Sequence, residues 1–538
     1  MLRGIHIFVA AVFSIVCYAS AQRNSGVEDL YSSNRAPVPL TRIDKLVLPK
    51  VKRTGYQPKF CTDHVFLRRA YLDITGTVPT AVEARRFIEN KSFNKRIKLI
   101  DKLLDSDAYA DHFTMKWCDI LRVKAEFPVN LWPNAAQAYH HWVRTSLRDN
   151  KSYDKFVREM LVSNGSNFRV GPVNFYRAMQ SRTPEGIASA VALTFMGSRT
   201  DHWDAKQLKD MSVFFSEVSY KPTREWKEQV VYWDPNKPFN TITNPALQTA
   251  EYKKRDTAVF PDGKKVTLPY GRDPRVIFAD WLITDKNPWF ATIYVNRVWA
   301  WFMGRGIIHE VDDIRKGNKP SNVELLKHLR KVFISSGYDM KKLIRYILMS
   351  QTYHLSSVYD GDNEDQLEPI FAFYKMRRLD AELLIDAINK VTGSTELYTS
   401  AIPEPFTFVP ANKPAVSLPD GSITSSFLEM FGKPARASGM DNERINKLTA
   451  GQKRYMLNST HIRNKIEKGS NFKRIFSGKL KRQQVVDELY LTILSRYPTT
   501  DEISWINSYV TSVKLSARDA SIDVAWSLIN SDEFLYKH

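Results

Sequence analysis

Polar residues interrupt apolar helical patterns at three places in the chain, and their side chains are the best suited to bind a ligand or to do chemistry. They are Asp119 and Arg122, then Asn296 and Arg297 with Trp299, and finally Arg378 with Asp380 and Glu382. An arginine within an apolar helix must find a partner when it is buried. One interpretation is that buried arginine–carboxylate pairs fix the packing between two domains. The other is a polar cleft in which Arg297 or Arg378 binds an anionic group.

If such a cleft is catalytic, Asp380 and Glu382 are the candidate acid and base, because paired carboxylates hydrolyse glycosidic bonds. Asp201, His202 and Asp204 offer nitrogen and oxygen ligands for a metal ion, although a solvated surface cluster gives the same pattern. The chain has no Cys-x-x-Cys-His motif, which excludes covalently attached c-type haem, and no cofactor is expected.

Three other stretches of the chain share a pattern that predicts helices. Each begins with Pro-(Thr/Ser)-x-x-Glu and ends about thirty residues later with Ser-x-x-aromatic; the stretches are Pro79 to Tyr109, Pro320 to Tyr353 and Pro498 to Phe534. The opening is typical of a capping box at a helix start. Gly337 and Asp339 mark the turn of the second copy, the first as a helix stop and the second as an N-cap. Each copy therefore predicts a helical hairpin used for packing; a repeated ligand-binding unit is the alternative.

The fold class that follows is mainly α, with two helical domains built from recurring helical hairpins. We expect an N-terminal extended segment over residues 22–60, a first domain over 61–218 and a second over 276–538. An irregular connector over 219–275 joins them. It carries a small β-hairpin at Thr257–Leu268, where Asp-Gly suits the turn.

The first residues are typical of an export signal. Arg3 is followed by a short apolar stretch and then by Ala19-Ser20-Ala21, which predicts a cleavable signal peptide over residues 1–21, cut after Ala21. The expected location is secreted or periplasmic, with no transmembrane segment after cleavage. Cys61 and Cys118 would then be the remaining cysteines; export permits a disulfide between them, but the sequence does not show that they meet.

The charge balance indicates the kind of partner. Removing residues 1–21 takes away one arginine and no acid, so the formal charge falls from +20 to +19. An exported basic protein seldom meets nucleic acid, so the expected counter-charge is an acidic polysaccharide or an acidic partner protein. The alternative is that lysine and arginine only solvate the outer faces of the helices.

Several ordered motifs resemble two paired families. In the first block they are Phe66-Leu-Arg-Arg-Ala-Tyr-Leu-Asp-Ile-Thr-Gly76, Trp117-Cys-Asp119-Ile-Leu-Arg122 and Tyr153-Asp-Lys-Phe156; in the second they are Asp273-Pro-Arg275, Asn296-Arg-Val-Trp299, Gly304-Arg-Gly306 and Arg378-Leu-Asp-Ala-Glu382. The first block resembles the planctomycete secreted cytochrome-like domain, and the second resembles its companion, the planctomycete secreted domain. Both families are of unknown function. The resemblance also implies the company of secreted sulfatase-like proteins, and hence of sulfated polysaccharide.

The chain departs from the family pattern at two places. Relatives carry Cys-x-x-Cys-His near Ser198–Trp203 and Cys-x-Cys near Met440–Asn442, and this chain has neither. The joint loss suggests that the two segments lie close together and form one site in relatives. Arg436, Glu443 and Arg444, around the second departure, are further binding candidates.

Three functions remain open on this reading. The first is a non-catalytic binding or scaffolding protein of the cell envelope for acidic, possibly sulfated, polysaccharide or for an acidic, sulfatase-like partner. The second is a glycan hydrolase that uses carboxylates at the domain interface. The third is a redox relative that has lost its haem or metal site.

Overall fold

The computed structural model describes residues 30–33, 35–237, 257–359, 363–513 and 515–538. It is 54% helical with a few short antiparallel strands, so the predicted mainly-α class is confirmed. The predicted signal peptide lies outside the described residues. Among the residues that are described, no helix combines the length and the apolar content that a membrane span requires.

The elements follow the chain in three groups. The first group contains α3 (Arg42–Lys52), α4 (Asp63–Thr75), α5 (Ala81–Glu89), α6 (Lys95–Leu104), α7 (Asp107–Ile120), α8 (Pro133–Arg148), α9 (Tyr153–Val162), α10 (Pro184–Val191), η2 (Ala192–Met196) and α11 (Ala205–Ser212). The second contains α12 (Pro274–Leu282), α13 (Phe290–Met303), α14 (Val323–Ser335), α15 (Met340–Leu348), α16 (Glu364–Leu367), α17 (Ala381–Thr392), α18 (Ser426–Met430) and η8 (Asp441–Glu443). The third contains α19 (Ala450–Asn458), α20 (Thr460–Lys468), α21 (Ser470–Ile475), α22 (Arg482–Ile493), α23 (Thr500–Val513), α24 (Ala517–Ile529) and α25 (Asp532–Leu535).

Helix α3 corrects the prediction that residues 22–60 are extended throughout. Thr41 caps it in a capping box with Asp44, whose carboxylate accepts from the Thr41 backbone N–H at 2.9 Å. Ile43, Val47 and Val51 repeat at helical spacing and are buried, and this burial stabilises the helix.

The repeated motif has the same hydrogen bonds in each copy. The serine side chains of Ser106, Ser350 and Ser531 accept from the backbone N–H three residues on and donate to the carbonyl three residues back. Thr80 with Glu83 and Thr499 with Glu502 form the predicted capping boxes. The middle copy differs, because Asn322 rather than Ser321 caps α14. Asp339 caps α15 as predicted.

The connector contains more strand than its sequence predicts. The predicted hairpin forms as β6 (Thr257–Val259) paired with β7 (Lys265–Thr267). A second hairpin, of β4 (Val218–Pro222) and β5 (Gln229–Trp233), was not predicted, and β3 (Gly165–Ser166) pairs with β5 on its other side. Two short pairs complete the strands, β1 (Ser32–Ser33) with β2 (Phe60–Cys61) and β8 (Arg377–Arg378) with β9 (Tyr536–Lys537).

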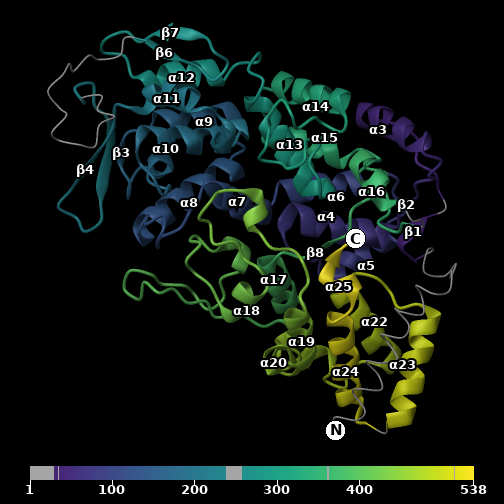
Figure 1. Ribbon diagram of the computed structural model, residues 1–538. Helices are drawn as coiled ribbons and strands as arrows, with labels where there is room; N and C mark the ends of the chain where they lie inside the picture. Colours follow the sequence, from purple (N-terminus) through teal and green to yellow (C-terminus); the bar gives the residue numbers. More distant parts are fainter. Residues whose placement is uncertain (1–29, 34, 238–256, 360–362, 514) are drawn as a thin grey trace.

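The described residues form two hydrophobic cores. The two cores are not divided at the connector predicted over residues 219–275. The first core runs from residues of α3 to those near Tyr374 and also includes Leu491 of α22, so it contains helices from both predicted domains. Helix α13 is buried along its whole length in this core. The second core is built from α17 and the later helices, together with Leu72 of α4 and Met115 of α7. In Figure 1 the helices from α17 onward (green to yellow) lie below those coloured purple to teal, with α4 and α7 near the junction.

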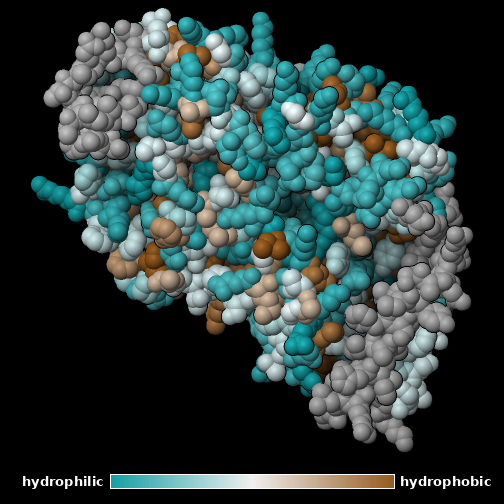
Figure 2. All heavy atoms as spheres, viewed as in Figure 1, coloured by the Kyte–Doolittle hydropathy of each residue, from teal (hydrophilic) through white to brown (hydrophobic). Residues whose placement is uncertain are grey.

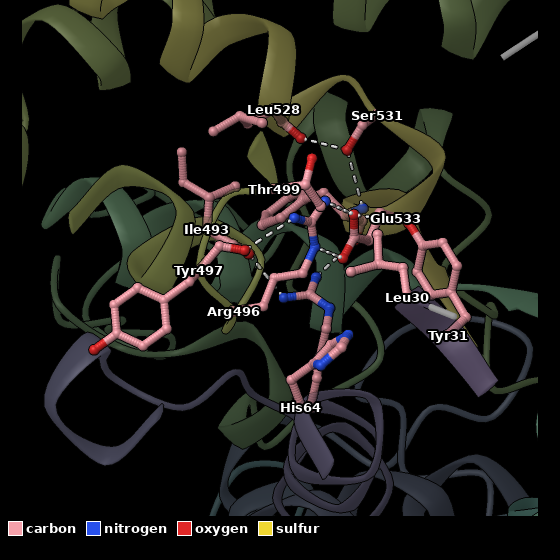
Figure 3. A network of polar contacts seen from close by, with 12 residues as sticks. Leu30, Tyr31, His64, Ile493, Arg496, Tyr497, Thr499, Leu528, Ser531 and Glu533 are labelled. Atoms are coloured by element: carbon pink, nitrogen blue, oxygen red, sulfur yellow. Dashed lines mark hydrogen bonds and ion pairs between the residues drawn. The ribbon is translucent and has the colours of Figure 1, made fainter. Parts of the chain in front are cut away.

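An ion-pair network fastens the third repeat to the start of the chain. Arg496 binds Glu502 and Glu533, with four nitrogen–oxygen distances of 2.7 to 2.8 Å. Glu533 also accepts from the Tyr31 hydroxyl at 2.9 Å (Figure 3). The neighbouring Arg68 donates to the carbonyls of Ile493 and Phe534. Every oxygen–nitrogen contact named here joins protein groups to one another, so we assign the network to packing. The face of the molecule seen in Figure 2 is mostly hydrophilic, with apolar side chains in small separate groups.

Candidate functional site

A ladder of ion pairs joins the first helical block to the last third of the chain. Arg444 donates to Asp119 at 2.6 Å and to Glu382 at 2.6 Å, and Arg436 donates to the other oxygen of Asp119 at 2.8 Å. The Glu382 side chain is 1% exposed and that of Arg436 is 2% exposed. Charges so far from water need such partners, and they hold the elements that carry them in register. The interpretation of these residues as paired packing contacts therefore holds for this ladder.

The local sequence explains where the ladder forms. Asp119 lies in the last turn of α7 and Glu382 in the first turn of α17. Between residues 431 and 445 the chain is irregular, and two side chains fix it. Arg378 donates to the carbonyls of Phe431 and Ile445. Glu443 accepts from the backbone N–H groups of residues 437 and 438 and from the hydroxyl of residue 438.

Two charged groups beside the ladder have no hydrogen-bond or ion-pair partner among the residues that the structure describes. Asp380 is only 6% exposed. Its carboxylate forms no hydrogen bond or ion pair with another described residue. Burial raises its pKa, but the charges of Arg444 and Lys116 outweigh this and hold the pKa below its ordinary value. Lys116 of α7 is half-buried, and the contact of its ammonium within the described part of the chain is with the ring of Trp301, 5.7 Å from the ring centroid. Burial lowers the pKa of Lys116 to about 8, with Asp380 opposing that fall.

Three of the candidate arginines have unused donors. Nε and Nη1 of Arg378, Nη1 of Arg436 and Nη2 of Arg122 are buried without a hydrogen-bond partner among the described residues. A buried N–H group left without an acceptor costs about 1–3 kcal/mol, so each of these groups would gain from an external acceptor. We call Lys116, Asp119, Asp380, Glu382, Arg436 and Arg444 the interface cluster.

A second chain of contacts joins the two segments at which the sequence suggests departures from the family pattern. Arg297 binds Asp312 at 2.6 Å and donates to the carbonyls of Leu193 and Thr194 in η2. Asp312 in turn accepts from the backbone N–H of Asp441 at 2.8 Å. Two residues on, Ile314 donates its backbone N–H to Gly197 at 2.7 Å. The segments near Ser198 and Met440 therefore both contact residues 312–314, which is the proximity that the hypothesis of one shared site requires.

The carboxyl of Asp441, in this second chain of contacts, has a raised pKa. Its side chain is exposed, but the protein atoms crowded around its carboxyl and the charge of Asp312 raise its pKa to about 6. Lys116, Arg297 and Arg444 oppose that rise, so Asp441 shares charged neighbours with Asp380. The two carboxyls thus have pKa values displaced in opposite directions.

The remaining binding candidates have structural roles. The Asn296 amide donates to the carbonyl of Ile308 and accepts from its N–H, both at 2.9 Å. Trp299 is buried and meets Phe371 edge-on. Arg122 donates Nε to the carbonyl of Ala178 at 2.7 Å and does not pair with Asp119, because its backbone turns out of α7 at a φ of 56°.

The candidate metal ligands do not converge in the structure. Asp201 pairs with Arg199 at 2.6 Å, and the Asp204 carboxylate caps α11. His202 lies 4.0 Å from oxygens of both Asp201 and Asp313. Across the described part of the chain, no three histidine, cysteine, aspartate or glutamate side chains are grouped in a way that could hold a metal ion.

The two described cysteines are free thiols. Cys61 lies in β2 and Cys118 in α7, and both are buried. The disulfide that export would permit does not form in the structure. Burial raises the pKa of Cys118 to about 12, which makes its thiol unreactive.

Three residues of the site were not among the candidates predicted from the sequence: Lys116, Asp312 and Asp441. Lys116 directly precedes Trp117 of a family motif, but a lysine in an amphipathic helix normally points to solvent. Asp441 lies in the segment Met440–Asn442, where the sequence suggests a departure from the family pattern. Its place in that segment was the sequence feature that could have made it a candidate.

Comparisons with known proteins agree with the two-block organisation. The PSCyt2 family, described as a protein of unknown function (DUF1549), matches residues 42–213. The PSD1 family, described as a protein of unknown function (DUF1553), matches residues 274–510. Searches of curated proteins and of solved structures returned no match. The chain therefore belongs to the paired planctomycete families PSCyt2 and PSD1, in that order from N- to C-terminus.

Proposed function

We propose that the interface cluster binds an acidic saccharide and that the protein is an exported, non-catalytic binding protein for acidic, sulfated polysaccharide. The observation that carries the proposal is the pair of unpartnered charges, Lys116 and Asp380. Each affects the pKa of the other, yet no hydrogen bond or ion pair of 4.0 Å or less joins them in the structure.

An acidic sugar has the groups that such a pair would receive. A sulfate or carboxylate accepts from the Lys116 ammonium and from the unused N–H groups of Arg378 and Arg436. A neighbouring sugar hydroxyl donates to the ionised Asp380 carboxylate. A simple anion would satisfy Lys116 but would be repelled by Asp380, so the pair favours a ligand that carries both groups.

A second candidate function, glycan hydrolysis, is favoured by one specific observation. Asp441 has a pKa of about 6, suited to a general acid, while Asp380 is held ionised, as a base or nucleophile must be. Glu382, the other predicted catalytic carboxylate, is held by Arg444 and does not suit that role.

Binding and product analysis on one set of glycans test both functions. Isothermal titration would measure the affinity of the purified chain for heparin, dextran sulfate and a sulfated galactan, each beside its desulfated form. Preference for the sulfated forms that survives physiological salt, with no shortening of the glycan, supports binding alone. Shortened products that disappear in Asp441→Asn would support the hydrolase. Equal affinity for sulfated and desulfated forms would contradict the proposal.

A further inference from the structure

We propose that a second surface, which we call the aromatic platform, docks the chain of an acidic polysaccharide outside the interface cluster. The platform consists of Trp132, Trp226, Lys227 and Phe406. Its residues come from three segments: the loop between α7 and α8, the turn between β4 and β5, and the long segment between α17 and α18. The choice of ligand rests on the proposed function, and the surface itself is a separate observation.

Direct contacts join the three segments. The rings of Trp132 and Phe406 meet edge to face with centroids 5.3 Å apart. The Lys227 ammonium lies 5.8 Å from the ring centroid of Trp132 and 5.0 Å from that of Trp226. In Figure 1 the segment between α17 and α18 leaves α18 as a long loop directed toward the side of β4. The aromatic side chains are therefore neighbours although they lie up to 274 residues apart in sequence.

The platform is built on ordered backbone. The turn that carries Trp226 closes a hairpin in which five residues of β4 pair with five of β5. The loop that carries Trp132 is pinned at both ends, because Ala125 donates its N–H to Asp420 at 2.8 Å and Trp132 donates its own to the carbonyl of Ala125 at 3.1 Å. Rings held in this way lose little conformational entropy when a ligand binds.

The rings remain available to a ligand. Trp226 is 68% exposed and Phe406 is 46% exposed, and the nearby sequence adds Phe408 at 69%. Single exposed apolar residues are ordinary, but a group that joins three segments indicates an interaction surface. The C–H face of a pyranose ring covers an aromatic ring while its hydroxyls stay in water, so a polysaccharide can use such rings without a closed pocket.

The charges on the hairpin select an acidic polymer. Lys221, Arg224 and Lys227 are exposed along the hairpin and its turn. The nearby acids are engaged elsewhere: Glu225 lies 3.6 Å from Arg169, and Glu228 accepts from the Thr223 hydroxyl at 2.6 Å. The cations therefore stand beside the rings, where sulfate groups of a stacked chain would meet them.

The platform is also continuous with the interface cluster along the chain. Helix α7 carries Lys116 and Asp119 and leads directly into the loop of Trp132. Beyond α17 the chain carries Phe406 before α18, and Arg436 and Arg444 after it. A polysaccharide long enough to lie on both surfaces would bind more tightly than its repeating unit alone.

Comparing a polymer with its repeating unit tests the platform. The polymer is the sulfated galactan, and the repeating unit is its sulfated disaccharide. Isothermal titration would measure the affinity of wild type, Trp226→Ala and Phe406→Ala for each of these two ligands. We expect each variant to lose about tenfold or more in affinity for the polymer, equivalent to about 1.4 kcal/mol, and to keep wild-type affinity for the disaccharide. Trp505→Ala is the matched control, because this tryptophan is 55% exposed on the distant α23 and should change neither affinity. Lys227→Gln should weaken binding of the sulfated polymer and spare the desulfated one.

The outcomes separate the two proposals. Polymer binding that is unchanged in both aromatic variants would overturn the platform while leaving the interface cluster in place. Polymer binding that needs the platform while the disaccharide fails to bind would overturn the interface cluster alone. A wild-type chain that binds neither ligand would overturn both proposals. Platform variants whose only change is loss of self-association would overturn the platform alone, because the surface would then join copies of this chain. Because the substituted side chains are exposed, circular dichroism and thermal melting should match wild type.

Discussion

Arg444 of the PSD1 segment donates to Asp119 of the PSCyt2 segment at 2.6 Å, across 325 residues of sequence. The same guanidinium binds Glu382, whose side chain is almost completely buried. The contact therefore does two things. It locks α7 to α17, and it leaves Lys116 and Asp380 beside it without hydrogen-bond or ion-pair partners in the described structure.

Loss of Arg444 should be costly. Arg444→Ala leaves Glu382 charged and unpaired, and we expect the free energy of unfolding to fall by about 3–5 kcal/mol. Denaturant unfolding followed by circular dichroism measures it. Arg463→Ala is the control, because its pair with Glu467 spans one helical turn at the surface and should contribute about 0.3–0.5 kcal/mol. A loss below about 1 kcal/mol for Arg444→Ala would show that the ladder does not couple the two segments.

The middle copy of the repeat predicts a contrast between two adjacent residues. Asn322 accepts from the N–H of Leu325 and also donates to the carbonyl of Leu46. Asn322→Ala should therefore lower the free energy of unfolding by about 1–2 kcal/mol. The Ser321 hydroxyl is buried without a partner in the described structure, so Ser321→Ala should be neutral or slightly stabilising. The reverse order in thermal or urea unfolding would restore Ser321 as the cap.

The carboxyl of Asp441 should make stability depend on pH in a defined direction. Its pKa is about 6 in the folded chain against an ordinary 3.8, so the folded chain binds this proton more tightly than the unfolded chain does. The carboxyl therefore destabilises the fold progressively as pH rises from about 4 to 6, and by a constant amount above that range. Asp441→Asn removes this effect. Its melting temperature should match wild type near pH 4, exceed it increasingly up to pH 6, and keep a constant excess to pH 8. Parallel melting curves over the whole range would contradict the raised pKa.

Local spacing made much of the fold predictable. Thr80 with Glu83 and Thr499 with Glu502 are three residues apart, and so are the serine–aromatic pairs, so their hydrogen bonds close within one turn of chain. The same reasoning failed at Ser321, because Asn322 is an equally good cap one residue later. It also failed for β4 and β5, where five-residue strands carry too little alternation to be distinguished from a polar connector.

The site was less predictable, because its contacts are long-range. Asp119, Arg436 and Arg444 were candidates from the sequence, but the partner of each could not be chosen among dozens of opposite charges. Lys116 gave no signal because a lysine on a helix is usually solvated. In the structure its ammonium instead lies 5.7 Å from the ring centroid of Trp301, and the charge of Asp380 raises its pKa.

The most direct test of the account is the affinity of Lys116→Met for the sulfated disaccharide, measured by isothermal titration beside wild type and Lys327→Met. Methionine keeps the length of the side chain and removes the charge, while Lys327 is an exposed lysine on α14. We expect Lys116→Met to lose about tenfold or more in affinity for the sulfated disaccharide. Its affinity for the desulfated disaccharide should change little. Lys327→Met should behave as wild type toward both. Equal losses in the two lysine variants would mean that binding follows the overall positive charge, and would contradict a site between Lys116 and Asp380.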